Sequence, residues 1–455
     1  MSLREFVKNT IFTVNVRIAI LISGIINSVI IARILGPEGN GIYSLVVLLP
    51  TILLIFSDFG ISSASVYYIS KKKYFPSEVF GMNIIYSILV GTILILVGLI
   101  ITYFFNNKLF PGIERKYLLI ALLVIPIQIF FLLAINILLG LQKIKEYNLI
   151  ILINNYIFLV LIAIFLLKFH FGITAAIVTN ITSILIASII LYFFIKYHVG
   201  KATFTLNKKR VKDFFSYGIN IYIKTVLTFL QSKLGIILLN IFLNPTAVGL
   251  YSVGITITEK IQIISQSVNI LIFPKISSES NKKIVKEFTP LVCRNILFIT
   301  FLIVLTLFFV SKQIIIFLYS KQFLKSIVPF QILLIGIVSA SGNEIIFTDL
   351  MGRGKPFLIT PVCIFSIILN LMLNILLIPR LGIIGAAWSL VITYTLNFLI
   401  TLIIYIRISG NKINDIILIK KSDFLYYKKL LSFVIGKIQN FKVKIVMKNS
   451  SFRSL

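Results

Sequence analysis

LGPEGNGIYS (residues 35–44) and LNPTAVGLYS (residues 243–252) share the pattern L-x-P-x-x-x-G-x-Y-S at an offset of 208 residues. Each stretch joins two long apolar segments. A phrase that returns at the same place in the second half of a chain indicates an internal duplication. Many transporters are built from such repeats and bind substrate where the repeats meet. The phrase therefore predicts a duplicated membrane protein.

The composition also places the chain in a membrane. Hydrophobic residues make up 58% of the 455 residues and the mean hydropathy is +1.04, so a soluble fold could not bury the apolar surface. The net charge of +30 comes from basic residues between apolar segments, which we interpret as topology signals with no nucleic-acid partner. Cys293 and Cys363 lie in apolar stretches, and we expect no disulfide, metal site or cofactor. The first apolar run is full length and lacks a cleavage site, which predicts a retained span.

About 20 apolar residues cross the hydrocarbon as a helix, and the sequence contains twelve such segments. They lie at residues 11–32, 42–64, 79–105, 118–140, 149–168, 172–195, 214–243, 247–272, 288–310, 327–350, 357–378 and 382–406. With the N-terminus inside, the inside segments hold 30 lysines and arginines and the outside loops hold nine. This bias predicts a multi-pass protein of the cytoplasmic membrane with both termini inside.

The repeat continues beyond its opening phrase. Gly140 to Lys143 and Gly352 to Lys355 share a Gly-x-x-Lys spacing, and the Gly-Ile start of residues 172–176 returns in residues 382–387. The three landmarks keep the same order in both halves. Six spans are an even number, so both halves enter the membrane in the same orientation. The sequence therefore predicts an all-α integral membrane fold of two six-helix bundles, related by a pseudo-twofold axis along the membrane normal, with a cavity between them.

Four regions follow from this pattern. Residues 1–200 form the first bundle, 201–213 a basic cytoplasmic linker, 214–406 the second bundle and 407–455 a basic cytoplasmic tail. The tail predicts an amphipathic helix on the anionic inner surface, because its apolar residues return every three or four positions among lysines; a disordered basic tail is the alternative. These apolar residues are Phe424, Tyr427, Leu431, Val434, Ile438, Phe441 and Ile445.

The chain resembles the oligosaccharide or polysaccharide repeat-unit flippases of the multidrug/oligosaccharidyl-lipid/polysaccharide exporter superfamily. The likeness is carried by residues 32–44, with the pattern A-R-x-L-G-P-x-G-x-G-x-Y, by Phe59 and Gly60, and by the echo at 244–252. The resemblance implies a V-shaped pair of bundles that alternate access in a bacterial plasma membrane. It also implies an undecaprenyl-diphosphate-linked glycan as cargo, for surface polysaccharide biosynthesis, with membrane lipids and polysaccharide assembly proteins as further partners.

Two cations in the middle of spans suit such a cargo. Arg17 lies in the first span, and Lys224 in the seventh corresponds to Val16 once 208 is subtracted. A charge at this depth should face a bundle interior or a wet cavity. Together the two could hold a diphosphate, since arginine offers a fork of donors and lysine a mobile charge; pairing with a nearby acid or snorkelling are the alternatives. Lys233 is nine residues further on and points to the opposite side of the helix, so we expect only one of the two lysines to face the cavity unless the helix is broken.

A polar stripe marks the eighth span. Glu259, Gln262, Gln266 and Asn269 follow one another at three- and four-residue spacing, and Gln266 corresponds to Asp58 in the first half. Such a face does not belong against lipid. We expect these residues to bind the sugars of the cargo or to serve coupling, or else to hydrogen-bond neighbouring helices.

Other polar residues inside the predicted spans are weaker candidates for cargo binding. Glu344 is a candidate for ion pairing or coupling, whereas Arg294 and Asp349 lie close to span ends, where an interfacial position explains them. Asn370 and Asn374, four residues apart, are expected to act in helix packing.

An enzyme is not expected. The sequence has two histidines, no H-E-x-x-H and no G-x-x-x-x-G-K-[ST], and its longest outside loop is too short to bury a catalytic site. A membrane glycan polymerase or glycosyltransferase is the alternative from another class. Within transporters, a multidrug–cation antiporter and a peptidoglycan-precursor flippase are the rivals. The antiporter would favour acidic and aromatic cavity walls, whereas Arg17 and Lys224 favour an anionic cargo.

Overall fold

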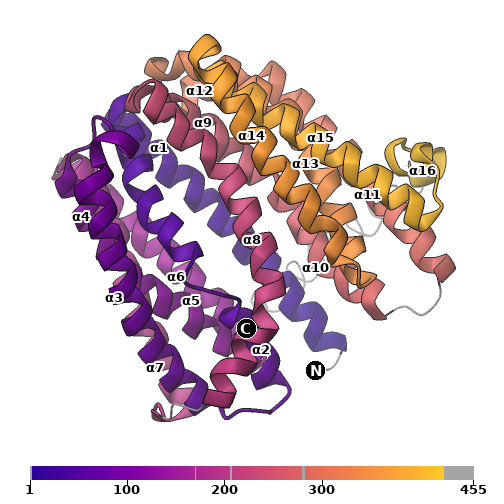
Figure 1. The fold of residues 1–455 in the computed structure, drawn as a ribbon, viewed down its shortest axis with the longest axis horizontal. Helices are drawn as coiled ribbons and strands as arrows, with labels where there is room; N and C mark the ends of the chain where they lie inside the picture. Colours follow the sequence, from indigo (N-terminus) through magenta and orange to yellow (C-terminus); the bar gives the residue numbers. More distant parts are fainter. Residues whose placement is uncertain (1–2, 170, 205–207, 279–281, 425–455) are drawn as a thin grey trace, which may run out of the picture.

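The computed structural model describes residues 3–424 except 170, 205–207 and 279–281, and omits some further side chains, Lys224 among them. All regular secondary structure in this part of the chain is helical (Figure 1). The predicted amphipathic tail helix lies outside the described residues apart from its first apolar residue, Phe424.

The first half begins with a long helix that changes direction at one residue. Gly36 has φ 69° and ψ −178°, which interrupts the helical torsions between the first two predicted spans. Glycine is suited to this position because it has no Cβ to clash. The helices of this half are α1 (Leu3–Ile55), α2 (Ile61–Ser70), α3 (Pro76–Leu109), α4 (Arg115–Leu122), α5 (Val124–Gly140), α6 (Ile144–Ile162), the π-helical η1 (Ala163–Lys168) and α7 (Gly172–Val199).

The second half repeats the phrase as a helix start. Asn244 accepts a hydrogen bond from the Ala247 amide at 2.9 Å and so caps α9, and Pro245 occupies the first turn, where a missing N–H costs nothing. The helices of this half are α8 (Lys208–Phe242), α9 (Pro245–Ile261), α10 (Ile263–Ser278), α11 (Lys282–Phe309), α12 (Ser311–Tyr319), the 3₁₀ turn η2 (Lys321–Ser326), α13 (Ile327–Gly352), the 3₁₀ turn η3 (Pro356–Leu358), α14 (Ile359–Leu381), α15 (Ile383–Ser409) and α16 (Ile413–Ile417).

Among the described residues, ten helical segments are long and apolar enough to cross a membrane. One of them, Phe12–Ile55, contains the first predicted span except residue 11 and most of the second. The eighth predicted span is divided between α9 and α10. The outward face of α3 carries Ile93, Leu96 and Ile100, each more than half exposed, as expected of side chains that face acyl chains. The chain is therefore a multi-pass membrane protein, and the count of twelve spans stays a prediction.

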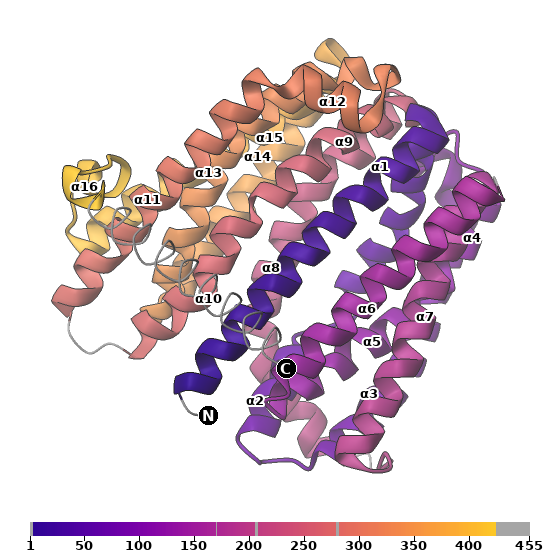
Figure 2. The same ribbon diagram turned by 180° about the vertical axis from the view of Figure 1, so that it is seen from behind.

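The helices form two arms that diverge from a common end (Figures 1 and 2). One arm holds α2 to α7 and the other α9 to α15, while α1 and α8 lie between them. Helix α8 contacts both arms. Near its start, Asp213 accepts hydrogen bonds from Lys73 and Tyr74, both at 2.6 Å, and further along it packs against α14 of the other arm. Residues 208–213 of the predicted linker are thus the first turns of α8.

The two copies of the phrase pack against each other where the arms meet. We call this part of the molecule the phrase end. A methyl group built on Gly41 would lie 1.8 Å from the Pro245 carbonyl oxygen, and one built on Gly249 would lie 1.8 Å from the Pro37 carbonyl oxygen. Ser44 Oγ donates a hydrogen bond to Ser252 Oγ at 3.3 Å. Residues 208 apart thus face each other, which is the contact pattern of a local twofold axis.

More contacts join α1 to α12 of the second arm at the phrase end. The Arg33 guanidinium donates hydrogen bonds to the Phe317 and Leu318 carbonyl oxygens at the end of α12. Ser28 and Tyr319 hydroxyls lie 2.9 Å apart. A cation at a helix C-terminus is stabilising because the last carbonyls have no helical partner. The phrase end is therefore closed by packing and by hydrogen bonds.

Candidate substrate cavity

A cavity of about 710 Å³ lies in the second half of the chain. Its walls come from α8, α9, α10, α13, α14 and α15, and Ile55 at the end of α1 completes them. The lining is rich in polar side chains, which are Thr225, Thr228, Gln231, Ser232, Lys233, Glu259, Lys260, Gln262, Ser265, Gln266, Asn343, Glu344, Tyr394 and Asn397. Such a wall offers donors and acceptors to a polar ligand.

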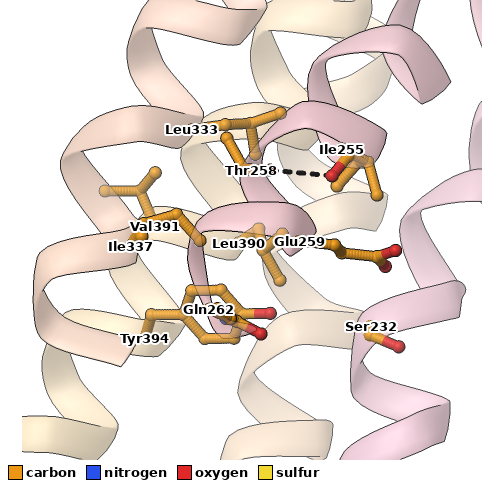
Figure 3. A pocket seen from close by; sticks show the side chains of 10 residues that line it. All are labelled: Ser232, Ile255, Thr258, Glu259, Gln262, Leu333, Ile337, Leu390, Val391 and Tyr394. Carbon is orange, nitrogen blue, oxygen red and sulfur yellow. Dashed lines mark hydrogen bonds between the residues drawn. The ribbon is translucent and has the colours of Figure 1, made fainter. Parts of the chain in front are cut away.

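The polar stripe reaches this cavity through an irregular helix. Helix α9 ends at Ile261 and α10 begins at Ile263, so the regular hydrogen bonding breaks at Gln262. In a membrane such backbone is tolerated where it borders protein or a wet cavity. Glu259, Gln262 and Gln266 all line the cavity. In the recess beside it, the side chains of Gln262 and Tyr394 lie together and the Glu259 carboxylate extends toward α8 (Figure 3).

Two cations and two carboxylates share the lining. Lys233 Nζ lies 3.0 Å from Glu259 Oε1, which is an ion pair between α8 and α9. Glu344 Oε1 accepts a hydrogen bond from the Asn269 side chain at 3.0 Å. Lys260 forms no ion pair with any carboxylate in the described part of the chain. The formal charges of the lining cancel, but among the described residues Lys260 and Glu344 each lack an ion-pair partner.

Lys260 also contacts α1, the helix that lies between the two arms. A methyl group built on Gly24 of α1 would lie 3.2 Å from Lys260 Nζ. The ammonium group therefore rests against the backbone of α1, beside a cavity formed by the second half. We call this place the seam between α1 and α9. An anion in the cavity would therefore find a positive charge at this seam.

The structure separates the predicted site residues. Glu259, Gln262 and Gln266 line the cavity, and Asn269 supports Glu344. Arg17 is partly buried on α1 within electrostatic reach of Tyr147 on α6, and it is not part of this cavity wall. The side chain of Lys224 lies outside the description, whereas Lys233 does face the cavity.

Asp58 is placed away from the stripe. It accepts hydrogen bonds from the Ser62 amide at 3.0 Å and the Ser62 hydroxyl at 2.7 Å, and so caps the start of α2. It does not line the cavity, although the repeat matches it with Gln266. The reason is local: the first half has a turn at Phe56–Gly60 where the second half continues from α9 into α10.

Lys260 was not among the predicted site residues, and Lys233 and Glu344 were predicted only as secondary candidates. Lys260 follows Glu259 directly, so a helix wheel puts it about 100° away from the stripe. The break at Gln262 and the nearness of α1 bring it to the cavity all the same. A lysine within an apolar span was itself a usable signal, because charges at such depth seldom face lipid.

The other ionisable residues have structural partners. Arg294 is buried and binds Asp423 through two hydrogen bonds of 2.6 Å, which ties the segment after α15 to α11. Asp349 pairs with Arg353 one turn later and accepts a hydrogen bond from Thr289 at 2.5 Å. The Asn374 side chain donates to Asn370 Oδ1 at 3.0 Å. No group of three potential metal ligands occurs in the described residues.

Comparison with known proteins adds family and fold. The model of a family described as "Polysaccharide biosynthesis protein" matches residues 30–328. A probable low-salt glycan biosynthesis flippase of Haloferax volcanii is 26% identical over 193 residues, which cover 42% of this chain and 41% of that protein.

Two solved structures share the fold. An inward-facing multidrug resistance transporter of the MATE family superposes with a TM-score of 0.74 at 16% identity, over 88% of this chain and 98% of that one. An inward closed form of the lipid II flippase MurJ gives a TM-score of 0.69 at 17% identity, over 94% and 96% of the two chains. The helices are thus arranged as in these transporters.

Proposed function

The chain belongs to the family of polysaccharide biosynthesis proteins, and we propose that it flips an undecaprenyl-diphosphate-linked oligosaccharide across the cytoplasmic membrane by alternating access. The fold shared with transporters of the multidrug/oligosaccharidyl-lipid/polysaccharide exporter superfamily supports this proposal. So does the flippase activity named for the Haloferax relative and for MurJ. Both termini and the C-terminal end of α15 would lie on the cytoplasmic side, and the phrase end would lie on the outer side of the membrane.

The observation that carries the proposal is the ammonium of Lys260 at the seam, which pairs with no carboxylate in the described residues. A charged group inside a membrane protein is costly unless an opposite charge or water reaches it. A diphosphate supplies that opposite charge, and the amides of Gln262 and Gln266 supply partners for sugar hydroxyls. The prenyl chain would stay in lipid.

Arg17 extends this arrangement along α1. It precedes Gly24 by seven residues, so the two share a helix face about 10 Å apart. We propose that Arg17 and Lys224 contact the headgroup together with Lys260, and that Asn269 and Asp58 act indirectly. The proposal includes two six-helix bundles at 1–200 and 214–406, whose separation at the phrase end would release the cargo.

The decisive experiment removes the gene and follows the cargo. Loss of the protein should make lipid-linked repeat units accumulate on the cytoplasmic leaflet, while a wild-type copy restores export. Exchanging Arg17 and Lys224 for Gln in one variant should abolish export while the protein still reaches the membrane. Normal export from that variant would remove these two residues from the site; the absence of accumulation on deletion would discard the function.

A multidrug–cation antiporter is the second candidate. It is favoured by the carboxylates Glu259 and Glu344 in the cavity and by the MATE-like fold. An antiporter would lower the intracellular level of a fluorescent cationic drug, and Glu344→Gln would stop it. A flippase would leave drug accumulation unchanged. Flipping of a peptidoglycan precursor is separated by assaying the leaflet position of lipid II in the same deletion strain.

A further inference from the structure

The ion pair between Lys233 and Glu259 is exposed to the cavity. Both side chains line it, with 23% of Lys233 and 47% of Glu259 accessible. Their 3.0 Å contact joins α8 to α9. Because both side chains keep part of their hydration, the pair costs little desolvation and either charge can be exchanged for another partner. This pair lies where a ligand can reach either partner.

Several other groups surround the Glu259 carboxylate. Lys260 follows it on α9, and Tyr394 on α15 and Tyr251 on its own helix are within electrostatic reach. Glu344 lines the same cavity from α13. Among these groups, the ion pair recorded for Glu259 is with Lys233. The carboxylate therefore holds the second lysine of the cavity in a neutral pair.

Resting on the function proposed above, we propose that Glu259 is an exchangeable counter-ion that the anionic headgroup displaces from Lys233. The headgroup first binds Lys260, which forms no ion pair with a carboxylate in the described residues. It then takes Lys233 from Glu259. Because the displaced carboxylate stays nearby and repels the anion, binding is weaker than two free lysines would give. A transporter needs such a limit, since a ligand held too tightly is not released.

The test measures binding of geranylgeranyl diphosphate to the purified full-length protein, with geranylgeraniol as the probe that lacks the diphosphate. Glu259→Gln keeps the shape but removes the charge, so the diphosphate should bind about threefold to tenfold tighter. In flipping assays the same variant should show a lower KM together with a lower kcat. A loss of structure would weaken binding instead, so the direction separates the two explanations.

A double-mutant cycle with Lys233→Met shows whether the gain depends on the lysine. In that background Glu259→Gln should bring at most a small gain. Glu344→Gln tests for a general effect of cavity charge, since Asn269 rather than a lysine holds Glu344, and Glu287→Gln is the control outside the cavity wall. Equal tightening by Glu344→Gln and Glu259→Gln would overturn the inference, as would unchanged or weaker binding in Glu259→Gln.

The outcome also separates this inference from the proposed function. One outcome is that the wild type binds geranylgeranyl diphosphate no better than geranylgeraniol, with the same affinity in Lys260→Met. That result would contradict the proposal that the cargo is anionic. If the wild type prefers the diphosphate and Lys260→Met weakens it while Glu259→Gln does not tighten it, the cargo stands and the counter-ion role fails.

Discussion

Lys260 is the residue on which the proposal of an anionic cargo depends most. Its ammonium touches α1 at Gly24 and faces the cavity without a carboxylate partner in the described part of the chain. A hydrogen bond to a charged group contributes about 1.5–3 kcal/mol, and each 1.4 kcal/mol is about tenfold in affinity. Lys260→Met should therefore reduce glycan export at least about tenfold at normal protein level. Lys116→Met is the matched control, because that lysine is exposed and paired with Glu114; equal loss in both variants would contradict the assignment.

At this scale the sequence predicted which residues are polar and deep but not which of them meet. The stripe of Glu259, Gln262 and Gln266 follows from helical spacing within one segment. The pairing of Glu259 with Lys233 depends on how α8 and α9 are rotated against each other, which no local pattern encodes. Asp58 and Gln266 are equivalent in the repeat, but a turn in the first half makes Asp58 the cap of α2 and keeps it out of the cavity.

The start of α8 is expected to depend on pH. The Asp213 carboxylate accepts hydrogen bonds from Lys73 and Tyr74, and these bonds lower its pKa below the ordinary value. A lowered pKa in the folded state means that the stabilisation is complete above the unfolded pKa, and is lost as the pH falls through the folded one. At residues 209–216 the protection from hydrogen exchange, measured relative to the intrinsic rate at each pH, should fall below about pH 4 in the wild type.

Asp213→Asn is the variant that checks this assignment. In this variant residues 209–216 should exchange faster at neutral pH and should lose the acid-dependent step, because the side-chain amide of asparagine does not titrate in this range. Glu114→Gln removes a carboxylate whose partner Lys116 belongs to the same arm, so α8 should be unaffected. An acid step that persists in Asp213→Asn would assign it to another group.

The two copies of the phrase depend on the absence of side chains at their closest approach. A methyl group at Gly41 would overlap the Pro245 carbonyl, with 1.8 Å between the atoms, so Gly41→Ala must push α9 away. We expect a thermal midpoint several degrees lower and easier labelling of cysteines placed at the phrase end. Gly235→Ala is the control, because its methyl group would meet Tyr251 at an ordinary 3.5 Å. Equal stability of the two variants would show that the contact yields without cost.

For the whole molecule, the repeat was the most informative signal in the sequence. It predicted a duplicated helical membrane protein, and the fold matches transporters of the expected superfamily. The exchange of contacts between Gly41 and Gly249 was not predictable, because glycines at equal positions in two halves need not touch. Helix α8 begins against one arm and continues against the other. This position was not predictable either, because hydropathy indicates the length of a helix but not its neighbours.

Alternating access requires the phrase end to open, and the pair Ser44 and Ser252 allows this to be tested. Their hydroxyl oxygens are 3.3 Å apart and come from equivalent positions of the two halves. In a background with Cys293→Ala and Cys363→Ala, the double variant Ser44→Cys with Ser252→Cys should form a disulfide under mild oxidation, since the replacing sulfurs can approach each other closely. Because the crosslink holds the phrase end closed, oxidation should stop export.

Reduction of the disulfide should then restore export to the level before oxidation. The two single-cysteine variants serve as controls, because oxidant should leave their export unchanged. A shift on a non-reducing gel reports the crosslinked fraction, and residual export should fall in proportion to it. Full export by a fully crosslinked protein would mean that the cargo passes without separation of the two phrases, and a route beside the closed phrase end would have to replace alternating access.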